Sequence, residues 1–374
     1  MSQFKSLVTV SPLGFMYASA GGFLSPENLV GKSNYKFPPD AAAIAGLILN
    51  ANRSQGFADP QSLKQTLTVA GPFWAYTNNP AEFYVPMSRH QIIDEKSSDE
   101  WSLQHKERTD DLGKRRGDYS DGDYLNQYRW HRSKQDLKPA SSVTWQLIDT
   151  WGWPGDEIRQ DARYLKATPW RSTSFLHPRM KENERHVLDK NGLFLENAVQ
   201  IPDDICLVYL TNLDTLELNG WYRFGGEGHL VEVATKLIDE QHPFNKLLSQ
   251  KISHAFALTT PAVWGSNNLS YRYPQHPSFP KRDLKLLMDK PVPYRYRVGQ
   301  NKDDPRKGRR LGRGRYAVPS GSVYVFREPL NMTWWDFPEE WFPKEGFSLK
   351  QLGCGLCLPV EIQGVPECTT KRSA

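Results

Sequence analysis

The stretch FGGEGH at residues 224–229 is a glycine-rich turn between two apolar runs that are typical of strands. Glycine lacks the side chain that would hold a backbone away from a ligand, and it adopts positive φ without steric cost. The exposed amides of such a turn can form a concave site for an anion. A second glycine-rich loop, KGRRLGRGR at residues 307–315, adds arginines, whose forked guanidinium donates paired hydrogen bonds to phosphate. Together the two loops predict a protein that holds a phosphodiester backbone against a β-sheet.

The glycine turn does not match the common nucleotide-binding motifs. A dinucleotide fingerprint needs a helix directly after the glycines, and a P-loop needs Gly-Lys followed by Ser or Thr. Here residues 230–233 have an extended pattern, and no Gly-Lys-Ser/Thr follows. A tight hairpin turn without a ligand is the alternative for residues 225–228, and a solvated loop is the alternative for residues 306–315.

The composition is that of an ordinary globular protein. The 374 residues can bury a large core in one or two domains, with 39% hydrophobic and 24% charged residues. A net charge of +5 says little about a partner by itself. Its distribution says more, because residues 302–315 contain seven basic residues and only two acidic ones, Asp303 and Asp304.

Strand-like segments outnumber helical ones. Residues 41–51 carry apolar side chains at helical spacing behind a capping Asp40, and residues 243–254 show a second such pattern. Residues 67–74 alternate and then reach Gly71-Pro72, which predicts a strand that ends in a turn. The other segments predict an α+β fold with antiparallel sheets. Further strands are expected at residues 5–10, 205–210, 217–223, 230–233, 255–264, 284–288, 294–298 and 322–326.

Two segments differ from this pattern. Residues 88–140 mix acids and bases densely and contain few apolar residues, which predicts a long insertion or mobile loop with little to bury. The insertion contains two basic stretches, residues 114–116 (KRR) and 128–132 (YRWHR), for which a solvated surface and an RNA contact are both open. Residues 165–197 have the pattern of an extended arm or hairpin.

The cysteines and histidines do not define a catalytic or metal site. Cys354 and Cys357 have the spacing of half a zinc site, but there is no second pair, so we expect a buried strand end or loop and no metal. The nine histidines are scattered, and no cofactor motif is found. With no apolar leader and no run long enough to span a bilayer, we expect free thiols in a reducing cytoplasm and no membrane association.

Four segments, taken in order, resemble the RAMP superfamily of CRISPR proteins. More closely, they resemble the subunit of type III (Cmr-type) effector complexes that binds the 5′ handle of CRISPR RNA (crRNA). The sequence departs from the family pattern at His229, where the family usually has a basic residue such as Arg, and in the long insertion. The similar segments are residues 37–39 (FPP) with 44–47 (IAGL), 71–73 (GPF) with 84–86 (YVP), 225–228 (GGEG), and 316–324 (YAVPSGSVY).

The resemblance implies two ferredoxin-like (RRM-like) modules with antiparallel sheets, glycine-rich loops and a β-hairpin thumb. The N-terminal module would cover residues 1–200, with the charged insertion at 88–140 and the thumb at 165–197. The C-terminal module would cover residues 201–374. In the family the sheet face and the loops grip the crRNA handle, and the thumb crosses the guide.

The resemblance further implies a non-catalytic subunit that caps the guide-binding backbone of an antiviral ribonucleoprotein, with no cofactor. Its partners would be the crRNA 5′ handle, a polymerase-like large subunit and backbone RAMP subunits, with target RNA contacted indirectly. Loops that expose amides and arginines suit this role, because single-stranded RNA is held by stacking bases and neutralising phosphates. The candidate RNA-binding residues are Ser19, Gly21, Gly22, Lys36, His177, Arg179, Lys181, Gly225, Gly226, Glu227, Gly228, His229, Lys307, Arg309, Arg310, Arg313 and Arg315.

Two other functions fit parts of the sequence. A RAMP endoribonuclease that cleaves crRNA precursor or target RNA would need a general acid or base near the scissile phosphate, and His177, His229 and Asp189 are the first candidates. An unrelated β-rich interaction module would bind no RNA, and its glycine loops would be ordinary turns.

Overall fold

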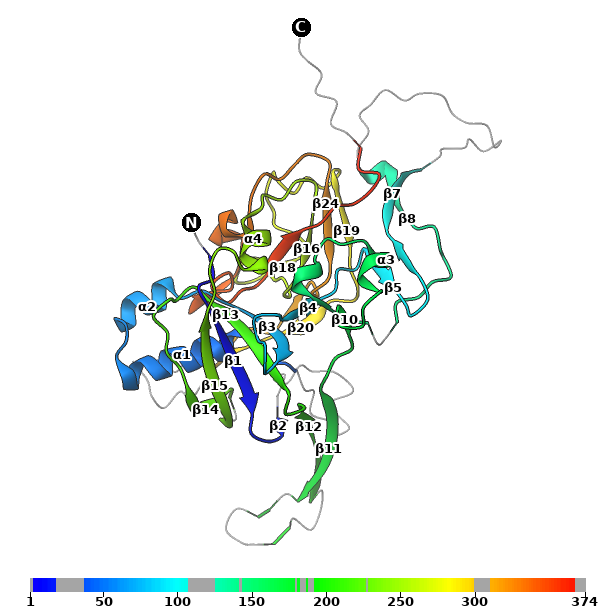
Figure 1. Ribbon diagram of the computed structural model, residues 1–374. Coiled ribbons are helices and arrows are strands. Elements are labelled where there is room, and N and C mark those ends of the chain that lie inside the picture. Colours follow the sequence, from blue (N-terminus) through cyan, green and yellow to red (C-terminus); the bar gives the residue numbers. More distant parts are fainter. Residues whose placement is uncertain are drawn as a thin grey trace, which may run out of the picture.

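Antiparallel sheets and a few short helices make up the fold, as the sequence predicts (Figure 1). The computed structural model describes residues 3–17, 37–106, 125–140, 143–178, 180–181, 186–187, 192–226, 228–298 and 310–366. Within these ranges, no helix is both long enough and apolar enough to cross a membrane.

The largest sheet has eight strands in the order β10-β9-β4-β3-β13-β1-β15-β14. All seven residues of β13 are buried, and β1 lies between β13 and β15. Strands β13, β14 and β15 lie beyond residue 200 and the other five lie before it, so the predicted boundary at that residue falls between neighbouring strands of one sheet. The strands are β1 (Ser6–Pro12), β3 (Val69–Tyr76), β4 (Tyr84–Pro86), β9 (Trp145–Leu147), β10 (Leu165–Lys166), β13 (Ile205–Thr211), β14 (Gly220–Phe224) and β15 (His229–Leu237).

Helix α1 (Ala41–Gln55) confirms the helical pattern and places Asp40 at its N-cap position. The apolar face of the helix, which includes Ile44 and Ile48, is buried against β3 and β14. The helix ends at Gly56, whose φ of 67° is the left-handed conformation typical of a helix C-terminus. The short helix α2 (Pro60–Thr66) follows, and Asp59 caps it by accepting a hydrogen bond from the Ser62 N–H at 2.7 Å.

The turn predicted at Gly71-Pro72 is wrong, because both residues lie inside β3. The register between β3 and β13 shifts between Val208 and Leu210. The backbone approaches Gly71 closely there: a Cβ on this residue would lie 3.0 Å from the Val208 carbonyl oxygen. Gly71 and Pro72 therefore lie at an irregularity within a paired strand and do not end the strand.

A second sheet of four strands has the order β19-β24-β16-β27. Helix α4 (Pro243–Ser249) is shorter than the predicted 243–254 and precedes this sheet. Stacked aromatic rings fill its core: the centroids of Phe256 and Tyr324 are 4.7 Å apart. One hydrophobic cluster runs through both sheets. The strands are β16 (Ala255–Leu258), β19 (Leu284–Leu287), β24 (Val323–Phe326) and β27 (Cys357–Pro359).

The insertion at 88–140 is more ordered than its composition predicts. Its described part forms two hairpins, β5 (Gln91–Ile93) with β6 (Ser98–Glu100) and β7 (Ser102–His105) with β8 (Tyr128–His131). Leu103 and Leu125 are buried in the hydrophobic core of the body, and Ile92 is buried as well. The expectation of little to bury is wrong for these parts, and the stretch 114–116 lies outside the described residues.

The arm expected at 165–197 is a β-hairpin that extends from the body at the bottom of Figure 1. It consists of β11 (Arg171–Pro178) and β12 (Leu193–Gln200), and β2 (Met16–Tyr17) pairs with the base of β12. The remaining elements are short. They are α3 (Gly155–Ile158), β17 (Trp264–Gly265), β18 (Ser270–Tyr271), β20 (Val292–Tyr294), β21 (Arg297–Val298), β22 (Arg310–Leu311), β23 (Arg315–Ala317), β25 (Lys344–Glu345), β26 (Phe347–Ser348), η2 (Leu125–Gln127), η3 (Ile148–Thr150), η4 (Trp334–Asp336) and η5 (Glu339–Trp341).

Candidate nucleic-acid interface

The central glycine turn closes the hairpin between β14 and β15. Phe224 pairs with His229, and Gly225 and Gly228 have φ angles of 73° and 70°. This is the tight hairpin geometry that the sequence left open as an alternative, and positive φ explains the two glycines. Among the described residues, a Cβ on Gly225 would meet nothing within 4 Å, so the described part of this corner leaves the backbone open to an approaching group. Glu227 lies outside the described residues.

The arginine loop is described from Arg310 onward, where the backbone of β22 begins. Arg315 differs from the prediction of a phosphate contact, because its side chain is only 4% exposed and forms an ion pair of 2.8 Å with Glu345. Its two terminal nitrogens also donate to the carbonyl oxygens of Ser266 and Asn267. A guanidinium used in this way supports the loop and presents no open donor to RNA.

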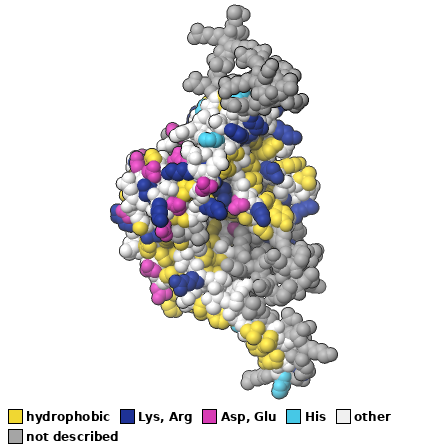
Figure 2. All heavy atoms as spheres, turned by 90° about the vertical axis from the view of Figure 1, so that its right-hand side faces the viewer, with side chains coloured by type: hydrophobic (Ala, Val, Ile, Leu, Met, Phe, Trp, Pro, Cys, Tyr) yellow, Lys and Arg dark blue, Asp and Glu magenta, His cyan; other side chains and the backbone are white. Residues whose placement is uncertain are grey.

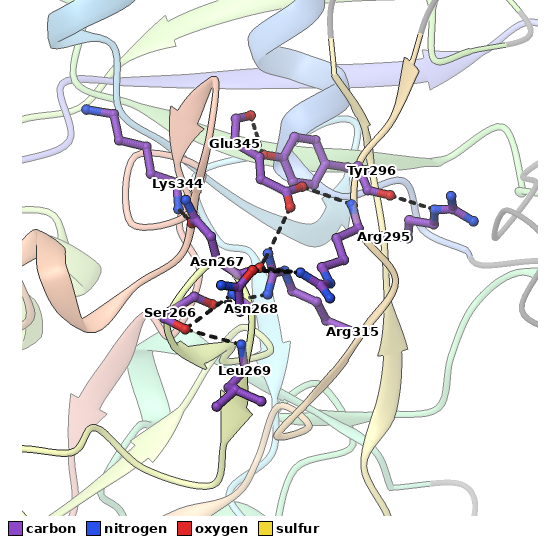
Figure 3. Close-up of polar contacts among 11 residues, drawn as sticks. Ser266, Asn267, Asn268, Leu269, Arg295, Tyr296, Arg315, Lys344 and Glu345 are labelled. Atoms are coloured by element: carbon purple, nitrogen blue, oxygen red, sulfur yellow. Dashed lines mark hydrogen bonds and ion pairs between the residues drawn. The ribbon is translucent and has the colours of Figure 1, made fainter.

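Glu345 is the centre of the network that holds the base of the loop (Figure 3). One carboxylate oxygen accepts from Arg315, and the other accepts from the Arg313 backbone N–H at 2.9 Å. The Glu345 carbonyl accepts from the Tyr296 hydroxyl at 2.9 Å. Burial raises the pKa of the Tyr296 phenol, so this hydroxyl keeps its proton. Gly312 fits here because a Cβ would lie 2.7 Å from the Glu345 carboxylate.

Arg313 is the described arginine of this loop that faces solvent. Its Nη1 donates to the Asn268 side-chain oxygen at 2.9 Å and to the Asn267 carbonyl at 3.3 Å. Among the described residues, Nη2 and Nε have no hydrogen-bond partner, and these two nitrogens lie on one edge of the planar guanidinium. Such an edge suits bidentate contact with a phosphate.

Three of the predicted RNA-binding segments join the body of the protein near the start of α1. Phe37, which ends the first glycine-containing loop, lies edge-on to Trp170 at the base of the β11–β12 hairpin, with ring centroids 5.1 Å apart. The Tyr209 hydroxyl of β13 donates to the Pro39 carbonyl at 2.6 Å. Tyr294 on β20 pairs with Arg315, so β20 lies beside the end of the arginine loop.

Asp40 is the electrostatic link at this junction. Burial raises the pKa values of Tyr209 and Tyr294 well above the usual range, and the nearby Asp40 carboxylate raises both further. One carboxylate acts on tyrosines from β13 and β20, so the start of α1 lies near both of these strands. The first loop, the hairpin and the arginine loop therefore leave the body from one region.

A row of apolar side chains, here called the apolar stripe, is the second surface feature. It runs from Trp221 and Leu230 on β14 and β15, through Leu13 and Phe15 after β1, to Phe175 on β11. Trp221 is 69% exposed, the Leu13 N–H donates to the Leu230 carbonyl, and the rings of Phe15 and Phe175 are 5.0 Å apart. Farther along the hairpin, Leu176 and Leu193 are also exposed, and Figure 2 shows hydrophobic side chains on this protrusion. Exposed apolar side chains in this number mark an interaction surface.

The remaining candidates are distributed as follows. His177 lies on β11 and His229 on β15, so they belong to different sheets. Lys181 lies beyond β11, where its N–H donates to the His186 carbonyl. In the part of the chain that the structure describes, no group of three or more His, Cys, Asp or Glu side chains is placed to hold a metal. Ser19, Gly21, Gly22, Lys36, Arg179, Asp189, Lys307 and Arg309 lie outside the described residues, as does the Arg310 side chain.

Sequence reasoning did not find Glu345, Asn267 or Asn268, which hold the arginines in place. They lie far from the arginine loop in the chain, and no local pattern distinguishes them from other surface residues. The cysteines agree with the prediction of a buried strand end or loop. Cys354 is buried in a turn, and the buried Cys357 begins β27, with the pKa of its thiol raised by burial.

Comparison with known proteins defines the class of this chain. The family of CRISPR-associated proteins described as Cas_Cmr3 matches residues 23–361. No curated protein sequence matches the chain. The match covers most of the sequence, including both glycine-rich loops, so the chain is a subunit of the type III CRISPR effector class. It belongs to the Cmr3 family, and this replaces the alternative of an unrelated β-rich module.

Solved structures of effector subunits are similar to this chain at low identity. One is a chain of the type III-B Cmr-beta bound to cognate target RNA, with a TM-score of 0.44 and 12% identity over 85% of this chain and 86% of that one. Another comes from the Csm3-Csm4 subcomplex of the type III-A interference complex, with a TM-score of 0.37 and 11% identity over 87% and 97% of the two chains. A third comes from the Csm1-Csm4 cassette with AMPPNP, with a TM-score of 0.37 and 10% identity over 96% and 99%.

Proposed function

We propose that this protein is a non-catalytic, RNA-binding subunit that holds the 5′ handle of crRNA and caps the guide-binding backbone of a type III effector. The observation that carries the proposal is the convergence of the first loop, the β11–β12 hairpin and the arginine loop at the start of α1. A strand of RNA held there would lie within reach of all three segments. In the proposal, each of the two sheets belongs to one ferredoxin-like module.

The arginine loop supplies the phosphate contacts in this proposal. Arg315 and Glu345 anchor the loop, and Arg313 presents an open guanidinium edge next to that anchor. Arg309 and Arg310 precede it in sequence and extend the same positive charge. A rigid base with exposed arginines reduces the conformational cost of binding, because fewer groups must be ordered when RNA arrives.

The hairpin and the apolar stripe supply the protein contacts. A backbone subunit bound along Phe15, Phe175 and Leu176 would bury apolar surface that is otherwise exposed to water. Each Å² of apolar surface removed from water favours association by about 25 cal/mol before the entropy lost on binding is subtracted. RNA binding and subunit docking thus use different chemistry, which lets them be tested separately.

The first test is purification of the tagged protein from its host, followed by sequencing of the RNA that accompanies it. We expect short RNAs that share one repeat-derived 5′ end, together with other effector subunits. A labelled copy of that RNA then serves for affinity measurements. Purification without RNA and without effector subunits would contradict the proposal.

The second test replaces Arg309, Arg310 and Arg313 with alanine and leaves Arg315 intact. Three lost phosphate contacts should weaken binding and reduce the slope of log K against log salt by about 2, since each contact on single-stranded RNA contributes about 0.7. The matched control removes the same charge elsewhere by Arg53→Ala, Arg159→Ala and Arg163→Ala. If both triple variants change the slope equally, the loop has no special role.

The absence of catalysis in this proposal is tested with the same RNA. Incubation with purified protein, with and without Mg²⁺, should leave the RNA intact. Specific cleavage that His177→Ala or His229→Ala abolishes would instead establish the endoribonuclease.

A further inference from the structure

An open surface groove with a volume of about 560 Å³ lies on β18 and the segment that follows it. Among the described residues, its lining combines aromatic rings with polar tips and one cation, and it contains no acidic residue. The lining includes Tyr271, Tyr273, Gln275, His276, Phe279 and Lys281.

The aromatic side chains of the groove are held in place from behind. Gly265 has a φ of 113°, and a Cβ there would lie 2.7 Å from Cδ2 of Tyr271, so this glycine makes room for the tyrosine ring. Tyr271 remains 38% exposed. Phe279 is buried, with its ring perpendicular to Trp341 and 5.1 Å from it. The groove therefore has a fixed apolar floor and an accessible aromatic wall.

Two polar side chains of the groove, His276 and Gln275, offer a donor and an acceptor respectively. The Ser278 backbone N–H donates to Nδ1 of His276 at 3.2 Å, which places the proton of the neutral ring on Nε2. The Gln275 amide group donates to the Tyr273 carbonyl at 3.4 Å, so its carbonyl oxygen is left to accept. A donor and an acceptor beside an aromatic wall match the edge and the face of a nucleobase.

The groove is continuous with the arginine loop through the turn between β17 and β18. Asn267 and Asn268 in this turn hold Arg313 and Arg315. Tyr271 lies three residues beyond Asn268, so the two residues are no more than about 10 Å apart, the length of three extended residues at about 3.3 Å each. The Tyr324 hydroxyl donates to the Arg272 carbonyl at 2.5 Å and fixes the strand that connects them.

We propose that this groove binds one unpaired base of the RNA whose phosphates contact Arg313, with Tyr271 stacking on the base and His276 contacting its edge. The inference rests on the proposed function, because it concerns the same RNA. A proline-rich peptide is the other occupant that an aromatic groove suits. RNA is favoured because the Lys281 cation lines the groove and, among the described residues, no carboxylate does.

The experiment measures binding of the full-length protein to a fluorescein-labelled single-stranded RNA of the host CRISPR repeat. We expect Tyr271→Ala to weaken binding about tenfold, within the range for loss of one stacked base, with the salt slope unchanged. Tyr271→Phe should bind like wild type, because it keeps the ring. His276→Ala should weaken binding less than Tyr271→Ala. Trp153→Ala, which removes an exposed ring elsewhere, is the control and should have no effect.

A set of RNAs that each lack one base identifies the nucleotide involved. At one position, removal of the base should abolish the difference between wild type and Tyr271→Ala. If the difference persists at every position, stacking on a single base is refuted. Equal thermal unfolding midpoints for all variants would show that the losses do not come from misfolding.

The possible failures can be told apart. If wild type binds no RNA, the proposed function and this inference both fall. If the arginine triple variant loses affinity but Tyr271→Ala does not, only the groove assignment falls. If a labelled decaproline peptide binds in a Tyr271-dependent way and RNA binding does not depend on Tyr271, the groove is a peptide site instead.

Discussion

Replacing Glu345 with glutamine tests the anchor of the arginine loop most directly. The change keeps the size of the side chain but removes its charge, and it leaves Arg315 as a buried cation. The two side chains are 15% and 4% exposed, so water cannot replace the lost partner. A glutamine whose oxygen accepts from Arg315 would also turn its NH2 group toward the Arg313 N–H. Removing one partner of a buried pair costs about 3–5 kcal/mol, and we expect about 3 kcal/mol here.

The assay is urea unfolding followed by tryptophan fluorescence, together with hydrogen exchange at the amides of Gly312 and Arg313. Both amides are hydrogen-bonded in this network, so they should exchange faster in the variant. Asp214→Asn is the control, because its pair with Lys5 is exposed on both sides and should leave the midpoint unchanged. A combined Arg315→Met and Glu345→Met variant should recover most of the stability, since apolar side chains often replace a buried pair well. An unchanged midpoint in Glu345→Gln would refute the reasoning.

Four further outcomes follow from the structure. Burial lowers the pKa of His90 from 6.5 to about 4, so the unfolded chain binds more protons than the folded chain between these pH values. The free energy of unfolding should therefore fall by roughly 3 kcal/mol as the pH drops from 7 to 4. In His90→Gln, the urea midpoint should depend less on pH. Gly353→Ala should destabilise the protein far more than Gly56→Ala, because both glycines have positive φ but only a Cβ on Gly353 would meet the β3 backbone, at 2.6 Å; thermal unfolding of the pair measures this. Burial raises the pKa of Cys206 to about 12 and also raises that of Cys357, so both should resist iodoacetamide until urea unfolds the chain; rapid labelling of the native protein, read by mass spectrometry, would contradict their burial. Leu176→Ser with Leu193→Ser should reduce capture of the backbone subunit without changing RNA affinity, and equal loss of both would mean that the hairpin acts through the fold.

Local sequence patterns predicted the structure correctly where the structure of a segment depends on its own residues. The helical spacing of Ile44 and Ile48 predicted α1, and the glycines at 225 and 228 predicted a turn between two strands. Residues 165–197 were predicted to form an extended arm or hairpin, and residues 171–178 and 193–200 form the hairpin. The resemblance to a CRISPR effector subunit likewise rested on short segments and on their order along the chain.

The errors occurred where distant parts of the chain decide the outcome. Gly71-Pro72 has the composition of a turn, but pairing with β13 keeps both residues in a strand. The insertion at 88–140 has few apolar residues, yet Leu103 and Leu125 are buried in the core of the body, and the described part is ordered. Arg315 was predicted to bind RNA because its neighbours are arginines, and its partner Glu345 is visible only once the chain is folded.

The division of labour between Arg313 and Arg315 affects how mutations in this loop should be interpreted. Alanine at either position would lower apparent RNA affinity, and a scan that measures affinity alone would count both as contacts. The two losses differ in their salt dependence, because only a lost phosphate contact changes the number of counterions released. Arg315→Ala should keep the wild-type slope and lower the fraction of folded protein, and it should behave like Glu345→Gln. Arg313→Ala should keep the unfolding midpoint and reduce the slope by about 0.7. If Arg315→Ala reduces the slope by that amount at an unchanged midpoint, the buried pair opens when RNA binds, and the anchor itself is part of the interface.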